Sequence, residues 1–162
     1  INAWKEAKCN NKNMDDFLKA VHRQSRDNSR TPLQWNDLQF AGFSSNKPWI
    51  DVNSNYEKIN VESEEDNPDS ILNYYREIIR IRKNNLTLIY GDFLDLEPDN
   101  EKLYIYKRWD KQKTFVVILN FSDEKILCDL NDLSSMILVI GNYKKSVYDG
   151  FMDPWEARVY KH

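Results

Sequence analysis

The chain has 162 residues, 41% of them hydrophobic and 13% aromatic, so it can fold around a sizeable core and is not a disordered protein. Its 23 basic and 26 acidic residues give a formal net charge of −3, which excludes the strongly positive field that attracts nucleic acid or anionic lipid. No apolar run approaches the roughly 20 residues of a membrane-spanning helix. We therefore expect a soluble protein of mixed secondary structure, with no nucleic acid and no membrane among its partners.

Cysteine and histidine are scarce in this chain. Cys9 and Cys128 lie far apart, and His22 and His162 are its two histidines. A zinc site needs clustered ligands, so these residues predict no metal site. We favour two reduced thiols in a cytoplasmic protein, with one disulfide as the alternative. The 4 glycines are scattered and form no G-x-G-x-x-G motif, so we expect no phosphate cradle and no cofactor.

The first part of the chain combines an amphipathic helix with a long connection. Phe17, Leu18 and Val21 recur at helical spacing, which predicts a helix over 14–24. Over 25–66 the periodicity disappears, but aromatic side chains are frequent, so we predict an ordered loop of a length that is usually functional. The first residues do not begin with Met and resemble the middle of an element. We therefore expect the chain to be part of a longer protein.

A second helix has the clearest pattern in the sequence. Ile71, Tyr75 and Ile78 lie at positions i, i+4 and i+7, and the segment ends with the basic residue Lys83. Basic side chains in the last turn interact favourably with the helix dipole. We predict a helix over 68–84, which at 1.5 Å per residue is about 24 Å long, similar to an outer helix of an α/β barrel.

After residue 86 the hydrophobic pattern changes to the period of two that is typical of strands. Short polar turns separate the alternating runs, which indicates an antiparallel sandwich. The aromatic side chains of these runs are predicted to fill the core, with a sugar-stacking face as the alternative. The predicted strands are 88–96, 103–109, 115–121, 125–130, 136–140 and 156–160.

The segment from Ser25 to Trp35 is the most unusual in the chain. It contains two arginines, Arg26 and Arg30, with an acid between them and the stiff residue Pro32 after them. A guanidinium group binds carboxylates and donates to hydroxyls in fixed directions. These residues leave two interpretations open: a network of Arg and Asp that braces a long loop, or an arginine that is presented to a ligand.

The same segment, S-R-D-N-S-R-T-P-L-Q-W at 25–35, resembles the S-R-D-N-x-R-T-P-M-Q-W motif of the oligo-1,6-glucosidase branch of glycoside hydrolase family 13. That branch includes dextran glucosidases, trehalose-6-phosphate hydrolases and sucrose isomerases. Leu33 replaces the usual Met, a change that conserves side-chain volume. The likeness continues in the family's order with A-G-F-S at 41–44, K-P-W-I at 47–50, N-Y at 55–56 and Y-G at 90–91.

The resemblance implies a fold and a division into domains. Family members have a (β/α)8 barrel followed by a C-terminal antiparallel β domain. The chain would thus be an α+β piece that contains the last loop and helix of the barrel and then a β-sandwich. Residues 1–85 would be the remnant of the catalytic barrel and 86–162 the β domain. The missing N-terminal barrel of the same protein would be the partner of this piece.

The resemblance also implies which residues bind substrate. In the family, an arginine of this loop reaches the glucose pocket and pairs with an aspartate from an early barrel strand. The matching residue is Arg30, with Arg26 as the alternative, while Asp27, Gln34 and Trp35 would support the loop. The substrate would be an α-linked gluco-oligosaccharide.

No catalytic residue is expected within this chain. Retaining glycosidases need two carboxyl groups about 5–5.5 Å apart, and the family's acids lie on middle barrel strands, before Ile1. We therefore expect the whole protein to hydrolyse α-1,6 or related α-glucosidic bonds and this chain alone to be inactive. The choice of linkage, and that between hydrolysis and isomerisation, stays open. A non-catalytic carbohydrate-binding module and a purely structural β domain are the alternatives.

Overall fold

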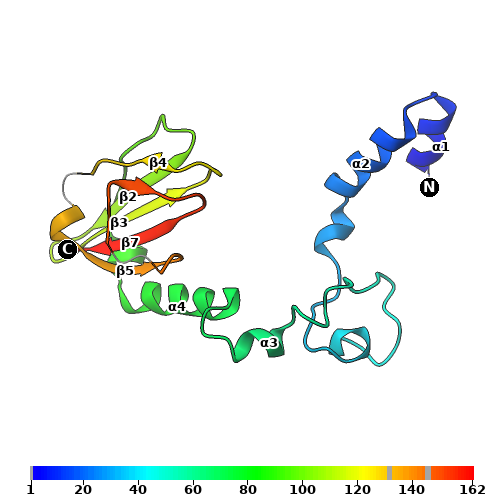
Figure 1. Ribbon diagram of the computed structural model, residues 1–162, viewed down its shortest axis with the longest axis horizontal. Coiled ribbons are helices and arrows are strands. Elements are labelled where there is room, and N and C mark those ends of the chain that lie inside the picture. The colour runs from blue at the N-terminus through cyan, green and yellow to red at the C-terminus, as the bar shows by residue number, and fades with distance from the viewer. Residues whose placement is uncertain (1, 131–132, 145–146) are drawn as a thin grey trace. The chain divides into compact units, whose positions relative to one another are not determined.

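A computed structural model describes residues 2–130, 133–144 and 147–162 of the chain (Figure 1). The chain forms two compact units, Ile1–Leu72 and Asn73–His162. The first unit holds short helices and a long loop, and the second is built on an antiparallel sheet. The fold class predicted from the sequence, mixed helix and antiparallel sheet, is confirmed. No helix within the described ranges is long and apolar enough to cross a bilayer.

The first unit begins with two helices, α1 (Asn2–Cys9) and α2 (Met14–Gln24). Asn13 caps α2, because its side-chain oxygen accepts hydrogen bonds from the backbone N–H groups of Asp15 at 3.0 Å and Asp16 at 3.4 Å. The two acidic side chains also suit the positive end of the helix dipole. α2 thus covers the amphipathic segment seen in the sequence, whereas α1 lies where no pattern was recognised.

The connection after α2 contains three short helices, η1 (Arg26–Ser29), η2 (Gln39–Gly42) and α3 (Val61–Glu65). α3 begins with a capping box: Asn60 Oδ1 accepts from Ser63 N at 2.8 Å, and Ser63 Oγ accepts from Asn60 N at 3.3 Å. The loop therefore contains local helical turns, each too short to produce a hydrophobic period.

The second unit contains a five-stranded antiparallel sheet in the order β1-β2-β3-β7-β5 and a two-stranded sheet of β4 and β6 (Figure 1). Its helices are α4 (Ile71–Asn84), most of which belongs to this unit, α5 (Thr87–Tyr90) and η3 (Leu133–Ser135). The strands are β1 (Asp92–Asp95), β2 (Leu103–Trp109), β3 (Thr114–Asn120), β4 (Ile126–Leu127), β5 (Ile137–Gly141), β6 (Phe151–Met152) and β7 (Ala157–Lys161).

Both faces of the larger sheet are covered. Alternate side chains of a strand point to opposite faces, and each face of β3 packs against a different cluster. On one face Ile118 of β3 belongs to a core cluster with Met152 of β6. On the other face Phe115 of β3 is 0% exposed and packs with Ile81 of α4 and Leu88 of α5. The sheet is thus held between helices on one side and the β4–β6 ribbon on the other.

The strand predicted at 88–96 is wrong in its first half, where residues 87–90 form α5. The cause is tertiary. Arg82 and Arg108 both donate through Nη1 to the carbonyl of Leu88, at 2.6 and 3.0 Å. These bonds satisfy the carbonyl of Leu88 within a single helical turn. They cannot be predicted from the hydrophobic pattern, because they come from residues outside α5.

The other elements differ from the predicted ones mainly at their ends. α4 begins at Ile71 and not at residue 68, because the preceding residues form a turn in which Ser70 N donates to Asn67 O at 3.0 Å. The strand predicted over 125–130 is reduced to β4, and its partner β6 was not predicted. Strands of two residues are too short to show an alternation.

Asp110 links α5 to the turn between β2 and β3. Its carboxylate accepts hydrogen bonds from Thr87 Oγ1 at 2.5 Å and from the backbone N–H groups of Gln112 and Lys113 at 2.8 and 2.9 Å. Because these bonds favour the charged form, with the Thr87 hydroxyl contributing most, they lower the pKa of the Asp110 carboxyl. The stabilisation is therefore present above the ordinary pKa of aspartate and is lost as the pH falls through the lowered value.

A buried ion pair lies in the sheet near its C-terminal strand. Glu156 and Arg158 are each 1% exposed, and Arg158 Nε donates to Glu156 Oε1 at 2.6 Å. Arg158 Nη1 also donates to Tyr160 Oη at 2.9 Å, and Glu156 Oε2 accepts from Asp153 N at 2.7 Å. Arg158 Nη2 has no hydrogen-bond partner among the described residues. The charge of the buried Arg158 guanidinium is therefore balanced by the Glu156 carboxylate.

We expect Glu156→Gln to lower the free energy of unfolding by about 3 kcal/mol, because it leaves the Arg158 guanidinium buried without an opposite charge. The change keeps the shape of the side chain and so isolates the effect of charge. Urea unfolding followed by circular dichroism measures it. The matched control is Glu124→Gln, which removes an exposed ion pair with Lys102 (2.7 Å) and should cost less than about 1 kcal/mol. Equal effects of the two variants would contradict this role.

Candidate functional site

The arginine-rich segment folds as the 3-10 turn η1 directly after α2. Ser25 Oγ accepts from Asp27 N at 3.3 Å and caps the turn, while Ser29 Oγ donates to the carbonyl of Arg26 at 3.0 Å. Arg30 N donates to the carbonyl of Asp27 at 3.1 Å and closes the turn. Side chains three positions apart eclipse one another in 3-10 geometry. This turn therefore places Asp27 and Arg30 side by side.

Arg30 interacts with two neighbouring side chains. Its Nε donates to Asp27 Oδ1 at 3.1 Å, and its Nη2 donates to the same oxygen. The guanidinium carbon also lies 5.4 Å from the centroid of the Trp49 ring, within the range of a cation–π interaction. The side chains of Arg30 and Asp27 remain 52% and 53% exposed. The guanidinium is thus held in place but still accessible to a ligand.

Arg26 is placed differently. Its backbone carbonyl accepts the hydrogen bond from Ser29. In the described part of the chain, its exposed side chain forms no hydrogen bond, ion pair or cation–π interaction with Asp27 or Trp49. The structure therefore brings Arg30, and not Arg26, together with an acid and an aromatic ring.

Gln34 and Trp35 join the start of the loop to its end. Gln34 Nε2 donates to the carbonyl of Ile59, and the carbonyl of Gln34 accepts from Val61 N at 2.9 Å. The carbonyl of Trp35 accepts from Glu62 N at 3.0 Å. These bonds join segments that are far apart in the sequence: Gln34 and Ile59, for example, are separated by 25 positions. A supporting role for both residues in a binding site stays a prediction.

A strained turn closes the middle of the loop. Phe40 (φ 55°, ψ 30°), Ala41 (φ 57°, ψ 29°) and Gly42 (φ 64°) all adopt the left-handed conformation. For residues other than glycine this conformation costs about 1–2 kcal/mol each. Ala41 is 0% exposed, and its carbonyl accepts from Trp35 N at 2.9 Å. The surrounding loop must therefore hold the turn, and such strain is concentrated at functional sites.

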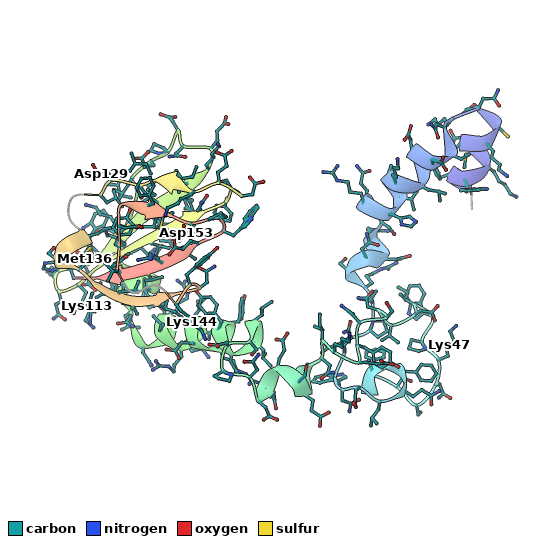
Figure 2. The ribbon with its side chains drawn as sticks, viewed as in Figure 1. Lys47, Lys113, Asp129, Met136, Lys144 and Asp153 are labelled. Carbon is teal, nitrogen blue, oxygen red and sulfur yellow. The ribbon has the colours of Figure 1, made fainter. Side chains whose placement is uncertain are left out.

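Trp49 is the residue of this site that sequence reasoning missed. It lies between the partners of an ion pair, in which Lys47 Nζ is 3.0 Å from Asp51 Oδ1 (Lys47 is labelled in Figure 2). Trp49 is 82% exposed, so it is not part of an apolar core in this unit. In the sequence it appears only within K-P-W-I at 47–50, and its contact with Arg30 depends on the path of the loop.

A hollow of about 360 Å³ lies beside the segment in the first unit. Glu64 is the one acid among the described residues that line it, and its Oε2 accepts from Leu72 N at 3.0 Å. The lining residues are Thr31, Pro32, Leu33, Gln34, Ile59, Asn60, Val61, Glu64 and Leu72.

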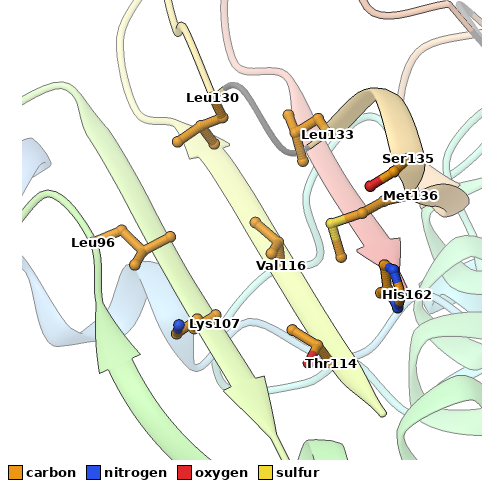
Figure 3. A pocket seen from close by; sticks show the side chains of 9 residues that line it. All are labelled: Leu96, Lys107, Thr114, Val116, Leu130, Leu133, Ser135, Met136 and His162. Carbon is orange, nitrogen blue, oxygen red and sulfur yellow. The ribbon is translucent and has the colours of Figure 1, made fainter.

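A cavity of about 440 Å³ in the second unit is shown in Figure 3. No acidic side chain is found among its described lining residues, which are Leu96, Lys107, Thr114, Val116, Leu130, Leu133, Ser135, Met136 and His162. Hydrolysis by a retaining glycosidase needs two carboxyl groups. The described lining of neither hollow supplies such a pair.

The described ranges also contain no group of three His, Cys, Asp or Glu side chains that could hold a metal ion. Both cysteines are free, with Cys9 exposed and Cys128 buried. Burial raises the pKa of the Cys128 thiol, and a thiol kept protonated is a poor nucleophile. Arg30 with its two neighbours thus remains the candidate site: a cation held in place for an oxygen-rich ligand.

Comparison with known proteins connects this geometry to a family. A model of the alpha-amylase catalytic domain matches residues 1–91. The oligo-1,6-glucosidase of Heyndrickxia coagulans is 37% identical over 161 residues, which are 98% of this chain and 29% of that protein. The chain thus spans less than a third of the length of this relative.

Solved structures agree with the sequence comparison. The isomaltulose synthase of Klebsiella sp. LX3 matches 98% of this chain with 30% of its own, at 36% identity and a TM-score of 0.84. The trehalose-6-phosphate hydrolase of Bacillus licheniformis matches 99% of this chain with 30% of its own, at 31% identity and a TM-score of 0.88.

The strained turn near the candidate site leads to a prediction about Gly42. A Cβ atom there would lie 2.4 Å from Asn36 Oδ1, which already accepts a hydrogen bond from Leu38 N at 3.1 Å. We expect Gly42→Ala to destabilise the loop by about 1–3 kcal/mol, since it adds this collision to a left-handed conformation. Amide hydrogen exchange at Trp35 N, which donates to Ala41 O, should accelerate accordingly.

Gly150→Ala is the matched control for Gly42→Ala. Gly150 also has a positive φ, of 84°, but a Cβ there would meet nothing within 4 Å. The control should leave exchange at Trp35 unchanged. Unchanged exchange at Trp35 in Gly42→Ala would show that the loop does not depend on this turn.

Proposed function

The chain belongs to the alpha-amylase family of glycoside hydrolases, and we propose that it forms the C-terminal part of a retaining α-glucosidase. This enzyme hydrolyses α-1,6 or related α-linked glucosidic bonds at the non-reducing end of short oligosaccharides. The similarity to an oligo-1,6-glucosidase at 37% identity supports this substrate class. The two free thiols fit a location in the reducing cytoplasm.

The anchoring of Arg30 is the observation that carries the proposal. A guanidinium has N–H donors in a fixed planar arrangement, which suits the hydroxyl groups of a sugar. Asp27 and Trp49 both interact with this group while it stays about half exposed. Arg30 binds the terminal glucose of the substrate, and Asp27, Gln34 and Trp35 maintain the loop that carries it. Arg26 takes no part in sugar binding.

The catalytic carboxyl groups and the rest of the barrel come from other residues of a longer protein. The first unit buries few apolar side chains among its described residues, while Leu38, Trp49 and Ile59 are 64%, 82% and 53% exposed. Apolar surface of this extent normally lies against another part of a protein. We assign residues 1–85 to the catalytic barrel and 86–162 to a C-terminal β domain, which counts α4 with the barrel although most of it belongs to the second compact unit. The family match ending at residue 91 supports this boundary.

We expect Arg30→Ala in the full-length protein to raise KM and lower kcat together. The loss in kcat/KM should be about 100-fold or more, because the change removes the charged hydrogen-bond donors of Arg30 from the sugar. Steady-state hydrolysis of isomaltose measures it. Arg26→Ala is the matched control and should change kcat/KM by less than about threefold. The assignment fails if Arg26→Ala has the larger effect or if Arg30→Ala has none.

The chain of 162 residues alone should release no glucose from isomaltose. A retaining glycosidase without its two carboxyl groups has neither nucleophile nor acid. A coupled glucose assay at high protein concentration measures turnover, and detectable turnover would contradict the proposal. Isothermal titration of the same chain with isomaltose tests the alternative, because binding at millimolar concentration or below would favour a carbohydrate-binding module.

A further inference from the structure

The contact between Arg30 and Asp27 leaves one motion of the guanidinium unrestrained. Nε and Nη2 both donate to Oδ1, and neither bonds to the second carboxylate oxygen. Two parallel bonds to two oxygens fix the plane of a guanidinium, whereas two bonds that converge on one oxygen allow it to rock about that atom. Asp27 therefore fixes the position of the guanidinium but not its orientation.

The Trp49 ring supplies the second restraint. The guanidinium carbon lies 5.4 Å from the ring centroid, so the cation is attracted to the ring. The ring therefore adds a second attraction to the hydrogen bonds that Arg30 makes with Asp27. Together the two side chains restrict the positions that the guanidinium can adopt.

Trp49 contacts Arg30 without belonging to an apolar core of its own unit. Trp49 is 82% exposed among the described residues. Pro48 restricts the backbone before it, and the Lys47–Asp51 ion pair, at 3.0 Å, closes the segment around it. The segment thus presents the ring while burying little of it.

We infer that Trp49 is a positioning residue for Arg30, which orients the guanidinium toward the hydroxyl groups of the substrate. This inference rests on the proposed function, because it assigns Arg30 to sugar binding. Trp49 acts through Arg30 and makes no separate contribution to binding. An arginine with a free tilt would lose part of its hydrogen bonding when the sugar distorts in the transition state, since misplaced donors reduce kcat more than they reduce binding.

The test uses the full-length protein and a double-mutant cycle with isomaltose as substrate. Trp49→Leu should lower kcat/KM by roughly 5- to 30-fold, mostly through kcat, and Trp49→Phe should restore much of the loss because it keeps an aromatic face. In the Arg30→Ala background, Trp49→Leu should add less than about a twofold change, because the group that it orients is gone.

A control variant and a spectroscopic measurement separate positioning from a general effect on folding. Phe43→Leu alters another half-exposed aromatic residue of the loop, one with no recorded contact to Arg30, and should leave both kinetic parameters within about twofold. The proton on Arg30 Nε should show a ring-current shift in the NMR spectrum that disappears in Trp49→Leu. This signal reports the contact whether or not the protein is a glucosidase.

The possible outcomes distinguish a failure of the positioning role of Trp49 from a failure of the proposed function. If Arg30→Ala is impaired while Trp49→Leu is not, the positioning role is wrong and the proposed function stands. If Trp49→Leu has the same effect in both backgrounds, Trp49 acts independently of Arg30, which also overturns the inference. Absence of the ring-current shift overturns it on structural grounds. Unaltered kinetics in Arg30→Ala would instead contradict the proposed function itself.

Discussion

A long, flexible arginine side chain can present its N–H donors in fixed directions only when it is held still, and the first unit restrains Arg30 through two neighbouring side chains. Two different forces provide this restraint: charge-assisted hydrogen bonds to Asp27 and the attraction of the cation to the Trp49 ring. Neither partner is buried, so the restraint depends on the loop that carries all three residues.

The loop is held by main-chain hydrogen bonds more than by apolar packing. Gln34 and Trp35 bond to the segment around residues 59–62, and Ala41 accepts from Trp35. The left-handed residues Phe40 and Ala41 persist only because these bonds determine their conformation. A loop built in this way is rigid where its backbone is paired, while its aromatic side chains remain available to other surfaces.

The second unit is stabilised by the opposite means. Its sheet is covered on both faces, and fully buried side chains such as Phe115 and Ile118 dominate its core. The Glu156–Arg158 pair is an exception within that core, where charge is retained at the cost of desolvation. This unit has a packed core of its own, whereas the first unit carries the candidate binding group.

Sequence reasoning performed well where a pattern extends over many residues. The helix α2, most of α4 and the strands β2, β3, β5 and β7 all lie where periodicity placed them. It performed poorly for α5, β4 and β6, because elements of two to four residues are decided by tertiary hydrogen bonds, such as those from Arg82 and Arg108 to Leu88.

Residue types at short spacing were enough to indicate the family resemblance, the mixed fold class and the two candidate arginines. The three-dimensional path of the chain was needed to show that Arg30 meets Asp27 and Trp49 while Arg26 does not. The Arg30–Asp27 contact follows from a 3-10 turn, whose tight winding superimposes residues three apart. The contact with Trp49 depends on the path by which the loop returns toward Arg30. Hydrogen bonds between backbone groups that are distant in the sequence direct this path, and no local sequence pattern predicts it.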